Sequence, residues 1–163
     1  SSKLEQGQLA LELEEASVLD IVLDAMARID LGERYLSIDI EEGLTIFLDR
    51  RLFRRVFENF LSNIARYTSE RTTVSVSAKK SEAWVLMEVS DTGEGVSELF
   101  LSEIFQPFAR EERSRSKRTG GFGLGLAFVR NVVECHGGSI EATQNHPSGL
   151  RFLISLPINS KLN

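Results

Sequence analysis

The chain has 163 residues, of which 42% are hydrophobic and 26% are charged, enough for one soluble globular domain with its own core. Its net charge of −5 gives no indication of nucleic-acid binding, and none is expected. The single cysteine, Cys135, excludes an internal disulfide framework, and with two histidines it offers no zinc-ligand spacing. No apolar run approaches the roughly 20 residues that cross a bilayer, so no direct membrane contact is expected.

Hydrophobic periodicity separates segments with a strand-like repeat of two from segments with a helix-like repeat of about 3.6 residues. In chain order we expect a helix end at 1–6, a strand at 9–13, a helix at 17–29, strands at 35–40 and 44–48, a long helix at 50–67, a hairpin of strands at 73–79 and 83–90, a short helix at 98–104, a long helix at 124–136, and closing strands at 139–143 and 150–156. This order predicts an α+β fold: a two-layer α/β sandwich with a mixed, mostly antiparallel sheet under about three long helices.

The first polar signal lies on the long helix expected at 50–67. Asn59 and Asn63 are four residues apart, so they share one helix face beside the stripe of Phe, Val and Ile. Asparagine is a mediocre helix former, and its amide oxygen is a neutral ligand of the kind that suits Mg²⁺. Taken alone, the pair is also compatible with a polar face turned toward solvent.

A second motif, Asp91-Thr92-Gly93-Glu94-Gly95, directly follows the strand expected at 83–90. A carboxylate at a strand end can accept a hydrogen bond from an exocyclic amine, and the two glycines allow the backbone to approach a flat ring. An acidic turn between two elements is the plainer alternative for the same residues.

A third motif, Gly-Gly-Phe-Gly-Leu-Gly-Leu at residues 120–126, enters the helix expected at 124–136. Glycines at a helix N-terminus leave backbone N–H groups free to bind phosphate. The motif has neither the spacing of a dinucleotide-binding fingerprint nor the Gly-Lys-Ser/Thr of a P-loop. A loop that simply closes at a helix start would give a similar pattern.

The segment between these two motifs combines aromatic and basic residues. Phe105-Gln106-Pro107-Phe108 comes first, and residues 110–118 then hold five basic and two acidic side chains, a local charge of +3. Beside a phosphate site, such a basic loop is typical of a lid that closes over ATP, with the Phe pair at its base. In isolation it is also compatible with an ordinary solvated loop.

Taken in order, the four motifs resemble the family of gyrase-type, heat-shock-chaperone-type, mismatch-repair and histidine-kinase ATPases. The resemblance is strongest to the catalytic domain of bacterial sensor histidine kinases, and it covers nearly the whole chain. Residues 58–67 are similar to the kinase N box, 91–95 to the first glycine box, 105–108 to the F box and 121–126 to the second glycine box. The resemblance implies a Bergerat-type ATP-binding fold, with residues 1–8 as the end of a dimerisation helix and 9–163 as the catalytic domain.

The resemblance also implies ATP and Mg²⁺ as cofactors, with Asn63 as the metal ligand and Asn59 supporting it. Arg66 would touch phosphate, Tyr67 would line the nucleotide, and Asp91 would accept a hydrogen bond from the adenine amine. The catalytic residues implied are Asn59, Arg66, Arg110 and Arg115. The nucleotide-binding residues implied are Asn59, Asn63, Arg66, Tyr67, Asp91, Gly93, Gly95, Val96, Phe105, Phe108, Thr119, Gly121, Gly123, Leu124, Gly125 and Leu126.

The reaction implied is transfer of the ATP γ-phosphoryl group to a histidine on a dimerisation domain absent from this chain. His136, at a helix C-terminus, and His146, in a turn, are interpreted as structural residues. The implied partners are the phospho-acceptor domain, a response regulator and a second copy in the parent homodimer. The domain would lie in the cytoplasm, with its parent in the inner membrane.

Two alternatives remain open. An ATP hydrolase of the same fold would place a glutamate base four residues before the metal-binding asparagine, where this chain has Asn59; the adjacent Glu58 points about 100° away around the helix. A non-enzymatic ATP-sensing module is also compatible, because intact nucleotide motifs do not establish turnover.

Overall fold

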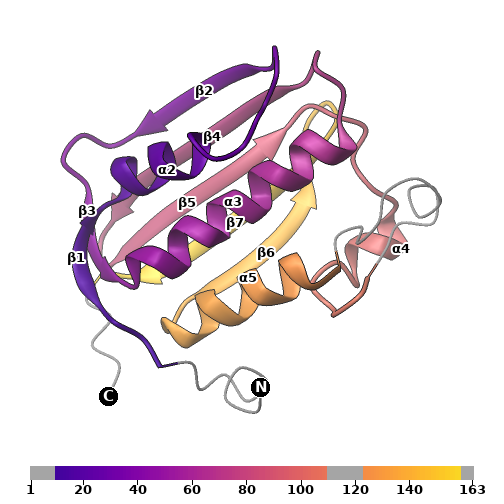
Figure 1. The fold of residues 1–163 in the computed structure, drawn as a ribbon. Coiled ribbons are helices and arrows are strands. Elements are labelled where there is room, and N and C mark those ends of the chain that lie inside the picture. The colour runs from indigo at the N-terminus through magenta and orange to yellow at the C-terminus, as the bar shows by residue number, and fades with distance from the viewer. Residues whose placement is uncertain (1–9, 110–122, 159–163) are drawn as a thin grey trace.

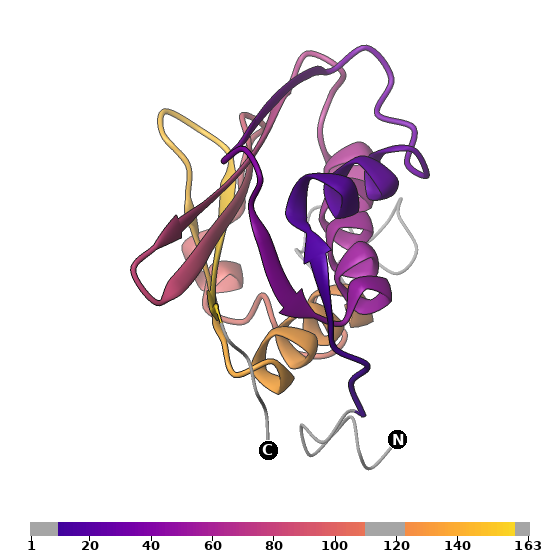
Figure 2. The same cartoon turned by 90° about the vertical axis from the view of Figure 1, so that its left-hand side faces the viewer.

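The computed structural model describes residues 10–109 and 123–158. In chain order the elements are β1 (Glu14–Ser17), α2 (Val18–Met26), β2 (Tyr35–Ile40), β3 (Thr45–Leu48), α3 (Arg50–Tyr67), β4 (Thr73–Ser81), β5 (Trp84–Asp91), α4 (Glu98–Leu101), α5 (Gly123–Cys135), β6 (Ser139–Gln144) and β7 (Leu150–Pro157). They form two layers, with α2, α3 and α5 covering one face of a five-stranded sheet (Figures 1 and 2). In these two ranges, no helix has the length and apolar character needed to cross a membrane.

The five-stranded sheet has the order β2-β4-β5-β7-β6. Strands β2 and β4 are parallel, whereas the other neighbouring pairs are antiparallel, which confirms the expected mixed, mostly antiparallel sheet. A parallel pair needs a crossover connection, and here the chain passes through β3 and α3 between β2 and β4. Strand β3 instead pairs with β1 in a separate two-stranded sheet.

Helix α3 is fixed to the sheet by a continuous apolar stripe. The stripe consists of six buried residues, Phe53, Val56, Phe57, Phe60, Leu61 and Ile64. The ring of Phe60 lies 4.8 Å from that of Phe152 on β7, centroid to centroid. Since each fully buried side chain of this size contributes about 1.5–3 kcal/mol, the stripe sets the helix firmly against the sheet and leaves its polar flank available.

The strand predicted at 9–13 is wrong in position. The structure places β1 at Glu14–Ser17, where Ala16 pairs with Ile46 of β3. Residues 11–13 alternate like a strand but have no ladder partner, because β3 ends at Leu48 and the chain then turns into α3. The N–H of Glu12 donates instead to the Asp49 carboxylate, at 3.0 Å.

The helix predicted at 17–29 is shorter than expected. It begins as predicted, with Ser17 Oγ accepting from the Asp20 N–H, and ends at Met26. The next turn is tighter, since the N–H of Ile29 donates to the Met26 carbonyl three residues back. The 98–104 helix is likewise shortened to α4, and α5 begins one residue earlier than expected.

His136 connects α5 to the start of α3. The imidazole is 1% exposed; its Nε2 accepts from the N–H of Asp49, the α3 N-cap, at 2.9 Å, and its Nδ1 lies 2.8 Å from the Val132 carbonyl. These roles require a neutral ring with the proton on Nδ1. Burial lowers the pKa of His136, against smaller opposing effects from the Val132 bond and the Asp49 charge. The interpretation of His136 as structural therefore agrees with its surroundings.

Candidate functional site

The polar flank of α3 turns toward α5 at Asn59. The half-buried side chain donates from Nδ2 to the Arg55 carbonyl at 2.8 Å, which orients its amide oxygen. A Cβ added at Gly125, in the first turn of α5, would lie only 2.8 Å from that oxygen. Glycine at 125 therefore allows the N-box helix and the second glycine motif to meet, and the structure brings two separate sequence motifs together here.

One turn further along α3, Asn63 lies on the same face. Its side chain is half-buried, and its Nδ2 atom is buried without a hydrogen-bond partner among residues 10–109 and 123–158. The two ends of an amide are assigned from their partners, so either end can point to a ligand. An amide in this state fits the role of a neutral Mg²⁺ ligand, since Mg²⁺ takes its other oxygens from water and phosphate.

Asp91, the last residue of β5, is a buried carboxylate at 6% exposure. Oδ1 accepts from the Gly93 N–H at 2.8 Å, and the backbone N–H of Leu150 provides a second bond. Burial raises the pKa of Asp91 above its usual value, while these two hydrogen bonds act in the opposite direction. A carboxylate has about four lone-pair sites, so the Asp91 side chain can accept a further hydrogen bond from an amine of a ligand.

The loop after Asp91 packs against the C-terminal end of α3. A Cβ at Gly93 would lie 2.7 Å from Cγ2 of Thr68, the residue that caps α3. The N-box helix, the first glycine motif and the start of α5 are therefore held in mutual proximity by contacts that need small residues. Sequence reasoning missed Thr68, although its position directly after the N-box segment 58–67 was a usable signal.

The predicted aromatic pair is divided by the structure. Phe105 is half-buried, and its ring packs edge-on to Phe152 at 6.0 Å, which agrees with an anchoring role. Phe108 is 73% exposed and has a positive φ of 66°, a conformation that a bulky residue rarely adopts. Phe108 is therefore not part of the anchored core.

The remaining predicted residues differ in burial, and some lie outside the described residues. Arg66 is exposed in the last turn of α3, and Tyr67 is half-buried against the core. Gly95 has a positive φ of 77°, and Val96 packs on the core. Gly123 and Leu124 begin α5, where Leu126 is fully buried. The predictions for Arg110, Arg115, Thr119 and Gly121, and for the segment 1–8, lie outside the described residues.

Glu58, the adjacent carboxylate on α3, points away from this site. Its Oε2 lies 2.8 Å from Nε of Arg54 and 3.7 Å from Nε of Arg28, which follows α2. The ion pairs hold the Glu58 side chain on the α2 flank, whereas Asn59 faces α5. No carboxylate of α3 thus stands where a hydrolytic base would be needed.

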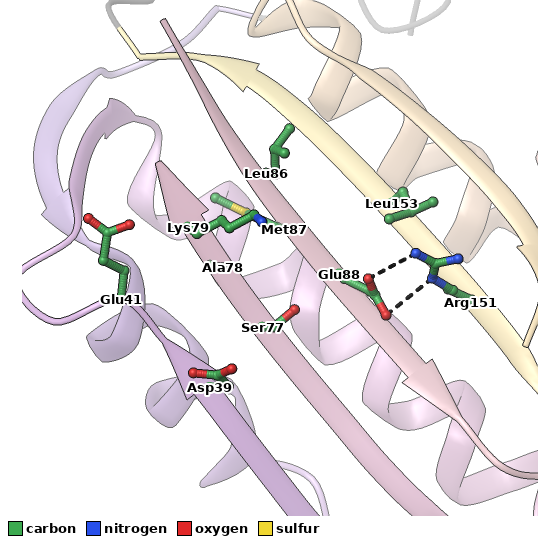
Figure 3. A pocket seen from close by; sticks show the side chains of 10 residues that line it. All are labelled: Asp39, Glu41, Ser77, Ala78, Lys79, Leu86, Met87, Glu88, Arg151 and Leu153. Atoms are coloured by element: carbon green, nitrogen blue, oxygen red, sulfur yellow. Dashed lines mark hydrogen bonds and ion pairs between the residues drawn. The ribbon is translucent and has the colours of Figure 1, made fainter. Parts of the chain in front are cut away.

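A hollow of about 490 Å³ lies on the other face of the sheet (Figure 3). Its lining includes an ion pair between Glu88 Oε2 and Arg151 Nε, 3.2 Å apart on neighbouring strands. None of the residues predicted from the sequence motifs lines it. The residues that these motifs bring into contact lie instead on the C-terminal half of α3, in the loop after β5 and at the start of α5.

The chain matches the family model for histidine kinase-, DNA gyrase B- and HSP90-like ATPases over residues 48–160. The signal transduction histidine-protein kinase BaeS of Escherichia coli K12 is 35% identical over 127 residues, covering 78% of this chain and 27% of that protein. The alginate biosynthesis sensor protein KinB of Pseudomonas aeruginosa is 33% identical over 162 residues, covering 96% of this chain and 27% of that protein. The chain spans about a quarter of the length of these relatives.

Solved structures show the same fold. The mycobacterial sensor histidine kinase MprB matches with a TM-score of 0.79 at 23% identity, over 90% of this chain and 99% of that one. Full-length ShkA, solved in complex with AMPPNP, matches with a TM-score of 0.79 at 24% identity, over 97% of this chain and 34% of that one. At these identities the likeness concerns the fold alone.

The chain belongs to the histidine kinase-, gyrase B- and HSP90-like ATPase family, as its fold and clustered motifs also indicate. Within that family it is homologous to sensor histidine kinases of two-component systems, of which this ATP-binding domain is the catalytic domain. The expectations of fold and family drawn from the sequence are confirmed.

Proposed function

We propose that this domain binds Mg²⁺–ATP and transfers the γ-phosphoryl group to a histidine of a dimerisation domain outside this chain. The observation that supports the proposal is that contacts join three separate motifs: Asn59 of α3 meets Gly125 of α5, and Thr68 at the end of α3 meets Gly93 beside Asp91. The buried carboxylate suits an amine donor, and the free amide suits a metal.

Each residue has a distinct part in this proposal. Asp91 accepts from the adenine amine, Asn63 ligates the metal, and Asn59 orients the start of α5 toward phosphate. Arg66 and Tyr67 contact phosphate and nucleotide from the last turn of α3. Bound Mg²⁺ supplies charge neutralisation, and phosphoryl transfer asks little covalent chemistry of the protein beyond positioning.

The position of Glu58 favours transfer over hydrolysis. Its carboxylate is paired with arginines on the α2 flank, and the neighbouring Asn59 cannot take a proton from water at neutral pH. Because α3 offers no carboxylate base at this position, we expect water to be a poor acceptor there and an external imidazole, itself a good nucleophile, to receive the phosphoryl group.

The partners we propose follow from this reaction. The acceptor domain belongs to the same parent kinase, and two copies of the parent form a homodimer. A response regulator takes the phosphoryl group onward. The domain acts in the cytoplasm, and its parent is an inner-membrane sensor.

The test measures two activities on the same preparations: transfer from labelled ATP to a supplied dimerisation domain, and phosphate release without it. Replacing both Arg110 and Arg115 by alanine should reduce transfer far more than ATP affinity, because these side chains would act on charge that develops in the transition state. Arg113→Ala with Lys117→Ala removes the same charge from the same segment of the sequence and should have a smaller effect. Fast hydrolysis with no transfer to any acceptor domain would contradict the proposal.

A further inference from the structure

The β6–β7 turn, taken as residues 144–149 and so including the last residue of β6, is bonded to the segment 91–96, which begins with the last residue of β5. No sequence motif accounts for these contacts. Three side chains of the turn donate hydrogen bonds to backbone carbonyls of that segment. They are Gln144 Nε2 to Val96 O at 2.7 Å, Asn145 Nδ2 to Asp91 O at 2.8 Å, and Ser148 Oγ to Thr92 O at 3.3 Å. The β6–β7 turn is thus hydrogen-bonded to both ends of the segment 91–96, although the two segments are about 50 residues apart in sequence.

The two segments touch so closely that side chains would not fit between them. Gly149 has a φ of 108°, and a Cβ there would lie 1.8 Å from the Asp91 carbonyl oxygen. Gly95 has a φ of 77°, and a Cβ there would lie 3.0 Å from both Gln144 Oε1 and the Gly149 carbonyl oxygen. Both glycines are therefore needed on conformational and on steric grounds.

Asn145 is the member of this turn that acts on Asp91 itself. Its own N–H donates to the Gly149 carbonyl at 2.9 Å, which closes the turn behind the side chain. The Asn145–Asp91 bond is short and half-buried, whereas the Ser148 bond is longer and exposed, so the first is the stronger. The carbonyl and the Cα–Cβ bond of Asp91 belong to one tetrahedral Cα, so fixing the carbonyl restricts the direction of the Cα–Cβ bond from which the carboxylate extends.

We infer that Asn145 is a positioning residue for nucleotide recognition, which aims the Asp91 carboxylate at the amine of the bound base. The inference rests on the proposed function, since it takes Asp91 as the acceptor for the adenine amine. Asn145 does not touch the nucleotide. It acts through the main chain of Asp91, while the Leu150 N–H holds one side of the carboxylate.

The experiment compares ATP with purine riboside triphosphate, which is the same nucleotide without the exocyclic amine. Calorimetric titrations in Mg²⁺ give the ratio of the two Kd values for each variant. In the parent chain the amine should contribute about tenfold in Kd, as expected for one hydrogen bond to a charged acceptor. In Asn145→Ala that ratio should fall close to one through loss of ATP affinity, while analogue binding stays nearly unchanged.

Two further variants complete the design. Asn145→Asp keeps the shape of the side chain but lacks the N–H donor, so it should lose the preference in the same way. Ser148→Ala removes the longer, exposed bond to Thr92 and should retain the parent's preference for ATP over the analogue. The ratio of two ligands on one preparation does not depend on the folded fraction, so partial loss of stability does not obscure the result.

The possible results distinguish a failure of the Asn145 role from a failure of the proposed adenine contact. If Asn145→Ala weakens both nucleotides equally, or keeps the parent's ratio, the positioning role is overturned while the ATP site stands. If the parent itself binds both nucleotides equally, Asp91 does not read the amine, and the inference falls together with that part of the proposed function.

Discussion

Two asparagines four residues apart on α3 have different surroundings. Asn59 is held by the Arg55 carbonyl and abuts Gly125, whereas the Nδ2 of Asn63 is buried and has no hydrogen-bond partner in the described part of the chain. A buried polar atom without a partner costs about 1–3 kcal/mol. A bound ligand that used the Asn63 amide would recover that cost, which makes Asn63 the more informative residue to change.

Asn63→Ala should weaken ATP binding by about 1–3 kcal/mol in the presence of Mg²⁺, because a ligand to the metal is lost. In excess chelator the parent and the variant should bind ATP with the same, lower affinity. Titration calorimetry measures both conditions. Arg51→Ala, an exposed change three turns earlier on the same helix, is the matched control and should leave affinity unchanged. Equal binding by parent and Asn63→Ala in Mg²⁺ would remove Asn63 from the metal site.

At the scale of elements, α5 is joined to α3 at both of its own ends. His136 ties the C-terminus of α5 to the N-cap of α3, and the contact of Asn59 with Gly125 joins the start of α5 to the middle of α3. Arg55 adds a third link, with its guanidinium carbon 4.3 Å from the centroid of the Phe128 ring. The orientation of α5, and of the glycine motif that begins it, is therefore set by α3.

Gly125→Ala tests the link near the site. Alanine gains up to about 1 kcal/mol in helix propensity, but its Cβ would displace Asn59, whose bond to Arg55 is worth about 0.5–1.5 kcal/mol. The free energy of unfolding should therefore change little, while Mg²⁺–ATP binding weakens. In an Asn59→Ala background the same change should raise stability. Urea unfolding of the four chains measures the coupling, and strictly additive effects would argue against the contact.

His136 gives stability a defined pH dependence. Its pKa in the folded state is lowered by burial, so between the unfolded value of 6.5 and the folded value only the unfolded chain binds the proton. Stability present above pH 6.5 should therefore fall as pH drops through this window, by at most about 1.4 kcal/mol per pH unit.

Urea unfolding between pH 7.5 and 5.5 measures this slope. His136→Gln should be less stable at pH 7.5 and should lack the His136 contribution to the slope, whereas His146→Gln, an exposed change, should retain it. Asp91 does not mimic the effect: its pKa is raised, so it favours the folded state as pH falls, with the opposite sign. Identical slopes for the parent and His136→Gln would contradict the assignment.

At the scale of the whole molecule, the two layers separate the proposed nucleotide site from the outer face of the sheet. That face is mixed in character: Leu86 and Leu153 line the same hollow as the ion pair between Glu88 and Arg151 (Figure 3). Of the two histidines, one is sealed between α3 and α5, and the other lies in an exposed turn. The molecule thus holds its only described buried imidazole where it cannot receive a phosphoryl group.

Incubated alone with γ-labelled ATP, the chain should therefore acquire no acid-labile phosphate. Both ring nitrogens of His136 are engaged, one with Asp49 and one with Val132, so the buried ring offers no lone pair for attack. Label retention after acid and base treatment measures phosphohistidine. Adding an acceptor domain is the positive control. Labelling that disappears in His146→Gln would show that the exposed histidine is an acceptor after all.

The sequence by itself determined the helices, most strands and the family. The period of the stripe from Phe53 to Ile64 and the alternation of β4, β5 and β7 are strong because they follow from burial on one face. The order of the motifs identified Asn63 and Asp91 as candidate site residues, because residue type and spacing can be read directly from the sequence. The strand predicted at 9–13 was wrong because alternation does not reveal whether a ladder partner exists.

Only the tertiary structure decided which of these motifs meet and what holds them. The contacts of Thr68 with Gly93, of Asn59 with Gly125 and of Asn145 with Asp91 join segments that are 25 to 66 residues apart, and no local pattern carries that information. The parallel pairing of β2 with β4 was equally hidden, because it depends on the crossover through α3. Local periodicity records which face is buried, whereas the identity of the neighbour is fixed only when the layers pack together.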